Sequence, residues 1–219
     1  MEDCTARYTK RARSKWAAVL AACICLACGP PDVRPLSHSD DRRRADGGQV
    51  ASRPARDADP YLVSATGIGA IRLGMTLAGA SDALPEATFE RTSDGDGAAL
   101  VSVTIAPGHS VVLRADEDDP ALAIDWSRTV RHIETFSSAF HTREGIHPGS
   151  LVSDVEQVFG TVQVIRKSEI ESREYITFVK QPAGLTFRLD YTGVFAEGSR
   201  ETKRFAPGAR IYSIAVSLD

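Results

Sequence analysis

The chain has 219 residues, of which 42% are hydrophobic and 25% charged, a composition typical of a globular protein with one large domain or two small ones. Its 26 basic and 29 acidic residues give a formal charge of -3, which argues against the concentrated basic surface that a nucleic-acid partner requires. Five of the basic and two of the acidic residues lie within residues 1–27, so the remainder carries 21 basic and 27 acidic residues and a charge of -6.

The amino terminus has the arrangement of a secretory signal. Residues 1–15 carry five basic side chains, and the uncharged apolar run 16–28 follows them. This run has thirteen residues, whereas a membrane-spanning helix needs about 20. It ends at the Gly-Pro-Pro of residues 29–31, through which no helix continues. We therefore predict that residues 1–27 are a signal peptide that is removed on export.

All cysteines of the chain lie at this end: Cys4, Cys23, Cys25 and Cys28. The remainder of the chain therefore lacks a thiol for a disulfide, a zinc site or nucleophilic catalysis. The apolar run resembles a bacterial lipoprotein signal, in which a box of small residues ends at a cysteine that is lipidated and becomes the first residue of the mature protein. The residues before Cys23, Leu-Ala-Ala, match the usual box, but lipidation at Cys23 leaves an apolar segment of only seven residues. Lipidation at Cys28 leaves an apolar segment of twelve residues.

The prediction places the lipid on Cys28, with Cys23 as the alternative position and a cleaved signal without a lipid as the alternative class. Gly29, and not Asp, follows Cys28, which in this resemblance implies an outer-membrane lipoprotein facing the periplasm. Residues 28–60 are rich in Pro, Gly, Ser, Asp and Arg and contain too few apolar residues to form a core. We predict that they carry the lipid on Cys28 and form a disordered tether.

Internal repetition is the most informative feature of the remaining sequence. A shift of 75 residues places Gly74 on Gly149, and the same shift places residues 100–103 on 175–178. Further along, a shift of 74 places residues 113–116 on 187–190, and a shift of 81 places Ile133 on Ile214. The pattern predicts two copies of one unit, residues 61–142 and 143–219, of which the second has gained a longer loop before its last strand.

Each copy is predicted to begin with a short helix and to continue with runs rich in β-branched and aromatic residues. The first helix opens at residues 74–76 and ends near Leu84, and the second opens at 149–150 and ends near Phe159. Residues 153–156 have the form of a capping box. The strands are expected at Thr88–Arg91, Leu100–Ile105, Ser110–Ala115 and Val130–Thr135, and again at Val162–Ile165, Tyr175–Val179, Leu185–Tyr191 and Ile211–Val216. The predicted fold class is α+β: two tandem repeats, each a short helix followed by a four-stranded antiparallel sheet.

Tandem units of this length, which open with a Gly-Met-Thr or Gly-Ser helix start and close with an Ile-x-Val strand, resemble the β-lactamase-inhibitor-protein fold. Residues 74–78, Gly-Met-Thr-Leu-Ala, are also similar to the opening of small outer-membrane assembly lipoproteins of the SmpA/OmlA type. The resemblance covers residues 66–219. It implies a concave sheet surface that grips a protein partner, and it matches no residue of this chain to an inhibitory contact.

The candidate chemistry is sparse. His132, His141 and His147 lack the helical spacing of a metalloprotease pair, so we predict neither a metal site nor a cofactor. Binding hot spots are rich in aromatic residues and arginine. The loop Thr192–Gly208 has this composition, and the candidate binding residues are Trp126, Phe195, Arg200, Arg204 and Phe205. The alternative interpretation is that the aromatic rings cap the ends of the sheets while the basic side chains are solvated.

These patterns together predict a non-catalytic envelope lipoprotein that binds another envelope protein or supports envelope assembly. Its predicted partners are the membrane, through the lipid anchor, and an envelope protein, and nucleic acid is excluded. A secreted soluble inhibitor or binding protein is the alternative, and an unrecognised hydrolase is the third class.

Overall fold

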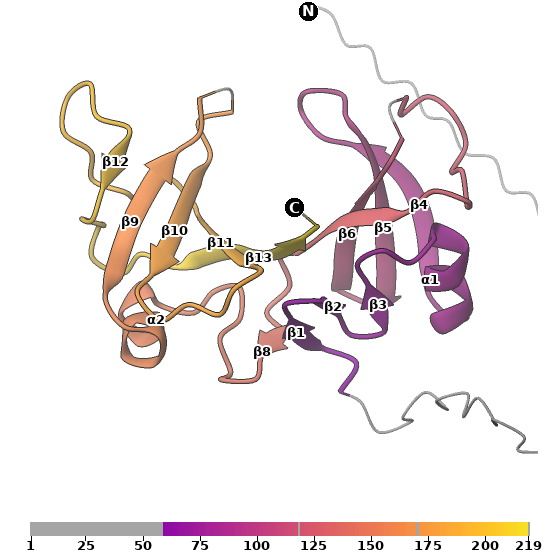
Figure 1. Ribbon diagram of the computed structural model, residues 1–219, viewed down its shortest axis with the longest axis horizontal. Helices are drawn as coiled ribbons and strands as arrows, with labels where there is room; N and C mark the ends of the chain where they lie inside the picture. The colour runs from indigo at the N-terminus through magenta and orange to yellow at the C-terminus, as the bar shows by residue number, and fades with distance from the viewer. Residues whose placement is uncertain (1–58, 118, 170, 219) are drawn as a thin grey trace, which may run out of the picture. The chain divides into compact units, whose positions relative to one another are not determined.

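The computed structural model describes residues 59–117, 119–169 and 171–218 (Figure 1). The predicted signal peptide, both candidate lipidation positions and nearly all of the predicted tether lie outside these residues. No helix in the described ranges is long and apolar enough to span a membrane.

Most strands belong to one antiparallel nine-stranded sheet with the order β12-β9-β10-β11-β13-β7-β6-β5-β4. Residues 61–142, the first predicted copy, contribute β4 (Thr88–Ser93), β5 (Ala99–Ala106), β6 (His109–Ala115) and β7 (Val130–Thr135). The second copy contributes β9 (Val162–Lys167), β10 (Glu174–Phe178), β11 (Leu185–Leu189), β12 (Glu201–Thr202) and β13 (Ile211–Ser217).

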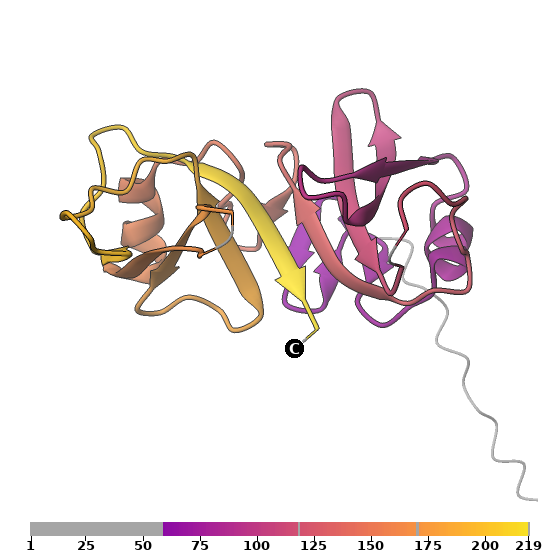
Figure 2. The same cartoon turned by 90° about the horizontal axis from the view of Figure 1, so that it is seen from above.

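The predicted fold class is wrong, because the two sets of strands do not form separate four-stranded sheets. The last strands that the two copies contribute to this sheet, β7 and β13, pair antiparallel with Ile133 opposite Val216 and Thr135 opposite Ile214. In Figure 2 the yellow β13 lies between the orange strands of the second copy and β7. The described residues contain two short helices and are mostly β-sheet. The physical reason is that two four-stranded sheets would each leave an unpaired edge, and joining the edges satisfies their N–H and C=O groups.

A second sheet of four very short strands has the order β3-β2-β1-β8. It consists of β1 (Leu62–Ser64), β2 (Gly67–Ile68), β3 (Ile71–Arg72) and β8 (His141–Thr142). A Cβ atom at Gly67 would lie 2.1 Å from the carbonyl oxygen of Ile71, so this hairpin requires glycine there. The prediction of one four-stranded sheet per copy did not include this sheet.

The two helices, α1 (Leu77–Ala83) and α2 (Val152–Phe159), are short. Thr76 caps α1, since its hydroxyl accepts a hydrogen bond from the Gly79 N–H at 3.1 Å. The predicted capping box of α2 does not form, because the N-cap is Leu151 and Ser153 lies inside the helix. The Glu156 carboxylate instead accepts a hydrogen bond from the Val162 N–H at 2.9 Å and ties the helix to β9.

One face of the large sheet and both helices share a single core. Leu77 of α1 and Val155 of α2 are fully buried in the same cluster as inward-facing residues of the strands, such as Leu113, Ile133 and Ile176. Along each strand the alternate positions point to the opposite face. In β6 this alternation puts Arg114 on that opposite face, which we call the open face and which carries the candidate site.

Candidate binding groove

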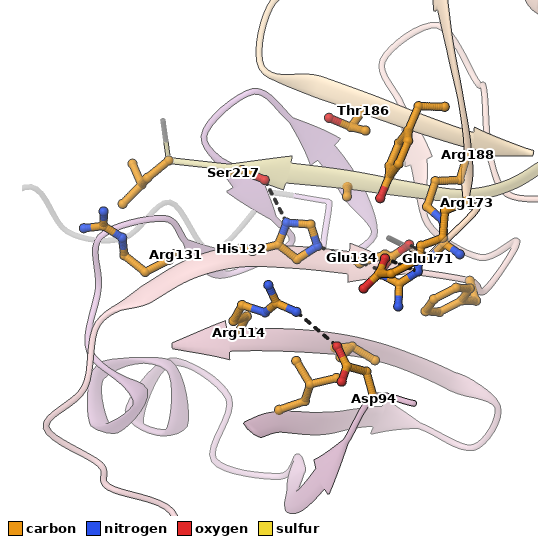
Figure 3. A pocket seen from close by; sticks show the side chains of 16 residues that line it. Asp94, Arg114, Arg131, His132, Glu134, Glu171, Arg173, Thr186, Arg188 and Ser217 are labelled. Atoms are coloured by element: carbon orange, nitrogen blue, oxygen red, sulfur yellow. Dashed lines mark hydrogen bonds and ion pairs between the residues drawn. The ribbon is translucent and has the colours of Figure 1, made fainter. Parts of the chain in front are cut away.

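A groove of about 460 Å³ lies over the open face, above the junction of the two copies (Figure 3). We call it the central groove. Its charged and hydroxyl-bearing lining residues come from both copies: Asp94, Arg114, Arg131, His132, Glu134, Glu171, Arg173, Tyr175, Thr186, Arg188 and Ser217. A volume of this size is within the range of ligand pockets.

Three neighbouring strands place a row of polar side chains across the groove. Arg114 of β6 lies opposite His132 of β7, which lies opposite Ser217 of β13. The Ser217 hydroxyl and His132 Nδ1 are 2.7 Å apart and share a hydrogen bond. His132 Nε2 lies 3.8 Å from a carboxylate oxygen of Glu134. The row therefore connects a hydroxyl, an imidazole and a carboxylate on one surface.

Glu134 is the buried acid at the centre of the groove. Arg188 of β11 donates a hydrogen bond to its Oε1 atom at 2.7 Å, and the Ser213 hydroxyl donates to the same atom. Burial alone would raise the pKa of Glu134, but the neighbouring His132 ring, the Ser213 hydroxyl and the Arg188 guanidinium outweigh burial and lower the pKa to about 2. Glu134 therefore stays ionised and fixes the position of Arg188.

Two hairpin tips border the groove, one from each copy. Asp94 and Asp96 follow β4, whereas Glu171 precedes β10, and carboxylate oxygens of all three lie within 4.8 Å of one another. Burial and the carboxylates of Asp96 and Asp94 raise the pKa of Glu171, against the opposing effect of Arg173. These carboxylates are the group in the described residues with the geometry to hold a metal ion. Arg114 already pairs with Asp94 at 3.1 Å and Arg173 with Glu171 at 2.6 Å.

Two exposed aromatic rings stand at the rim. Phe136 and Tyr212 are 42% and 43% exposed, and their rings pack edge to face with centroids 5.3 Å apart. The Arg188 guanidinium lies 5.4 Å from the Tyr212 centroid and 6.0 Å from that of Phe136. We call this pair the aromatic ridge. On its other side lies a second pocket of about 570 Å³, lined by both rings and by Pro148, Asp190, Thr192 and Arg210 among others.

The structure separates Trp126 from the other sequence-predicted binding residues, which lie in one loop. Trp126 packs on Phe89 of β4, at one edge of the large sheet, with ring centroids 5.7 Å apart. Phe195 and Phe205 are partly buried against the core near the opposite edge, where β12 pairs with β9.

The basic members of that predicted set lie in the same loop as Phe195 and Phe205. Arg200 donates a hydrogen bond to the Ser168 carbonyl at 2.8 Å and lies 3.6 Å from Glu169. Arg204 is exposed. A binding role for this loop stays a prediction, and so does its alternative, in which the rings cap the sheet.

Sequence reasoning missed the central groove and the aromatic ridge, although one signal was present. The repeat alignment that places residues 113–116 on 187–190 superposes Arg114 on Arg188. A charged side chain at the same outward position of both copies, between buried neighbours, indicates a shared polar surface on the open face. Nothing in the sequence pattern alone shows that the two arginines face one groove, because that follows from the pairing of β7 with β13.

The order of Ser217, His132 and Glu134 is also the order of groups used in nucleophilic catalysis. Two observations count against that use here. The carboxylate of Glu134 is already paired with Arg188, which weakens its support for a positively charged imidazole. The distance of 3.8 Å from His132 Nε2 to Glu134 exceeds hydrogen-bond length. The arrangement can hold and orient a polar ligand through hydroxyl, imidazole and guanidinium groups.

Comparison with known proteins gives a distant structural similarity and nothing on activity. No protein-family model matches the chain, and no curated protein matches it at a significant level. Among solved structures, the chain is similar to the crystal structure of the uncharacterized protein yfeY from Escherichia coli, with a TM-score of 0.47 and 15% sequence identity over 72% of this chain and 99% of that chain. The resemblance to the inhibitor-protein and SmpA/OmlA families is not shown by these comparisons and stays a prediction.

Proposed function

We propose that the protein is an exported, lipid-anchored, non-catalytic module that binds another envelope protein across the open face of its large sheet. The observation that supports this proposal is the aromatic ridge, in which Phe136 and Tyr212 stand exposed over Arg188 between two pockets. Aromatic residues and arginine next to a pocket are the composition of protein-binding hot spots. The proposal keeps the composition argument made from the sequence but moves it to different residues.

The ridge is also held in place before any partner arrives. Arg188 is only 14% exposed at its side chain and is fixed by Glu134, so the surface under the rings has little freedom to lose. Phe and Tyr side chains have few rotatable bonds, which keeps the entropic cost of binding low. A rigid aromatic ridge between the central groove and the second pocket is suited to a partner that inserts one side chain into each of them.

Variants of the ridge test the binding site. We expect cross-linking in intact cells to give a partner adduct with the wild-type protein, and Phe136→Ser with Tyr212→Ser to reduce it by about tenfold, the loss typical of hot-spot truncation. The matched control is Leu122→Ser with Val179→Ser, which removes two exposed apolar side chains outside both pockets. Equal melting temperatures verify the fold. An adduct that survives in the ridge variant, or that is lost equally in the control, contradicts the proposed site.

The lipid anchor needs its own test, which also distinguishes a lipoprotein from a secreted soluble protein. We expect Cys28→Ala to move the mature protein from the membrane to the soluble fraction, and Cys23→Ala to leave it in the membrane. Mass spectrometry of the amino-terminal peptide should show an acylated Cys28. An unlipidated amino terminus downstream of Cys28 contradicts the anchor and makes the protein a freely diffusing binding protein.

A hydrolase remains the second candidate because Ser217 and His132 share a hydrogen bond in the central groove. An alkyl fluorophosphonate probe reacts with activated serines and gives a direct test. We expect the wild-type protein and Ser217→Ala to be labelled equally weakly. Labelling that depends on both Ser217 and His132 would replace the non-catalytic proposal.

A further inference from the structure

We propose that one end of the central groove, formed by Arg114, Arg131, His132 and Ser217, binds a carboxylate-bearing segment of the protein partner. We call these four residues the basic end. The inference rests on the proposed function, because it states the chemistry of the segment that lies next to the aromatic ridge. It assigns acidic side chains to the basic end and an apolar or aromatic side chain to the ridge.

The geometry gathers hydrogen-bond donors at this end. Arg114, His132 and Ser217 occupy paired positions on three adjacent strands, and Arg131 precedes His132 on β7 (Figure 3). The side chains of Arg114 and Arg131 are each 48% exposed, so a ligand can reach them. A guanidinium offers five N–H donors in a planar fork that fits a carboxylate with two parallel hydrogen bonds.

The charges of the groove leave one arginine of the basic end, Arg131, without a carboxylate partner in the groove lining. Its three lining carboxylates are each already paired with an arginine: Asp94 with Arg114, Glu134 with Arg188 and Glu171 with Arg173. Arg131 has a loose contact of 3.7 Å with Asp116, which lies outside the groove lining. Within the described lining residues, no carboxylate remains to neutralise Arg131, so an anionic group complements this end.

The continuity of the groove favours a peptide segment over a small inorganic anion. Phe136 belongs both to the groove lining and to the aromatic ridge, so the basic end and the ridge border one hollow. A free phosphate would occupy the basic end alone. A peptide with acidic residues on either side of an aromatic residue contacts both, and its carboxylates match the guanidinium fork.

Two labelled peptides test the inference with the full mature protein. We expect fluorescein-Glu-Glu-Phe-Glu-Glu to bind in fluorescence anisotropy, and the matched Gln-Gln-Phe-Gln-Gln peptide to bind at least tenfold more weakly. Arg114→Gln with Arg131→Gln should remove this difference. The control Arg143→Gln with Lys203→Gln removes two exposed charges outside the groove and should preserve it. Because residues 28–219 carry a net charge of -6, general attraction of an acidic peptide is not expected.

Equal binding of the two peptides, or equal weakening by the control pair, overturns the inference. A competition with inorganic phosphate and with chloride gives a second check. If phosphate displaces the acidic peptide at a far lower concentration than chloride does, the inference is overturned in favour of a phosphate-bearing ligand. The cross-linking test of the aromatic ridge is independent of these outcomes. A ridge-dependent adduct without any preference for the acidic peptide would refute the chemistry proposed here and leave the proposed function standing.

Discussion

Replacement of Glu134 by glutamine removes the central charge of the groove, and the size of the effect follows from the pKa of this residue. Its pKa falls from 4.5 to about 2 in the folded protein. At 1.36 kcal/mol for each pKa unit, the ionised form stabilises the fold by about 3 kcal/mol at neutral pH. Because the folded-state pKa is below the unfolded value, this stabilisation is complete above pH 4.5 and is lost as the pH falls through 2.

The measurement is urea unfolding followed by circular dichroism at pH 7 and at pH 2. We expect Glu134→Gln to be about 3 kcal/mol less stable than the wild type at pH 7, since the partly buried Arg188 loses its counter-charge. At pH 2 the two proteins should approach the same stability. Other carboxylates with a lowered pKa, such as Glu117 and Asp94, are present in both proteins and cancel in the comparison.

A double-mutant cycle separates the ion pair from a general loss of packing. We expect Arg188→Met alone to destabilise the protein, and Glu134→Gln with Arg188→Met to recover part of the loss, because neither charge then remains buried alone. Additive effects of the two substitutions, or wild-type and Glu134→Gln curves that stay parallel from pH 7 to pH 2, would refute the reasoning.

Further substitutions probe the scaffold, each by its free energy of unfolding or its melting temperature. Thr76→Ala should cost about 1 kcal/mol because it removes the side-chain acceptor for the Gly79 N–H, and Thr76→Ser should preserve stability. Phe187→Ala should cost about 3–5 kcal/mol, since the ring is fully buried and packs against the rings of Phe159 and Phe178. Gly67→Ala should lower the melting temperature, because its Cβ would meet the Ile71 carbonyl, and an unchanged temperature would contradict that close approach. Deletion of residues 195–205 should also lower it, because β12 and the partly buried ring of Phe195 are lost.

The sequence patterns located most of the local structure but not the way it assembles. Eight of the strands lie where β-branched and aromatic runs predict them, and the two helices lie near their Gly-Met-Thr and Gly-Ser signals. The alternation of apolar and polar residues along a strand indicates which side chains face a core. It contains no information on which strand pairs with which neighbour in the sheet. The union of β7 with β13 was therefore not predictable from the two copies read separately.

The short strands and the site were missed for related reasons. Runs of two or three residues, such as β2 and β3, are too short to show a period. The aromatic residues of the loop around Phe195 drew the binding prediction because their composition is conspicuous. Phe136 and Tyr212 are separated by 76 positions in the chain and become neighbours only through the joined sheet.

The register of β7 against β13 also has a local two-fold symmetry. Glu134 lies opposite Ala215 in the pairing of β7 with β13. The shift of 81 residues also places Glu134 on Ala215. The register of the two strands is therefore that of a two-fold axis through this pair. A strictly symmetric register would place two identical residues opposite each other on that axis, and two glutamates there would repel. In this chain one side carries the acid and the other a small neutral residue, so the groove is asymmetric across the β7–β13 junction.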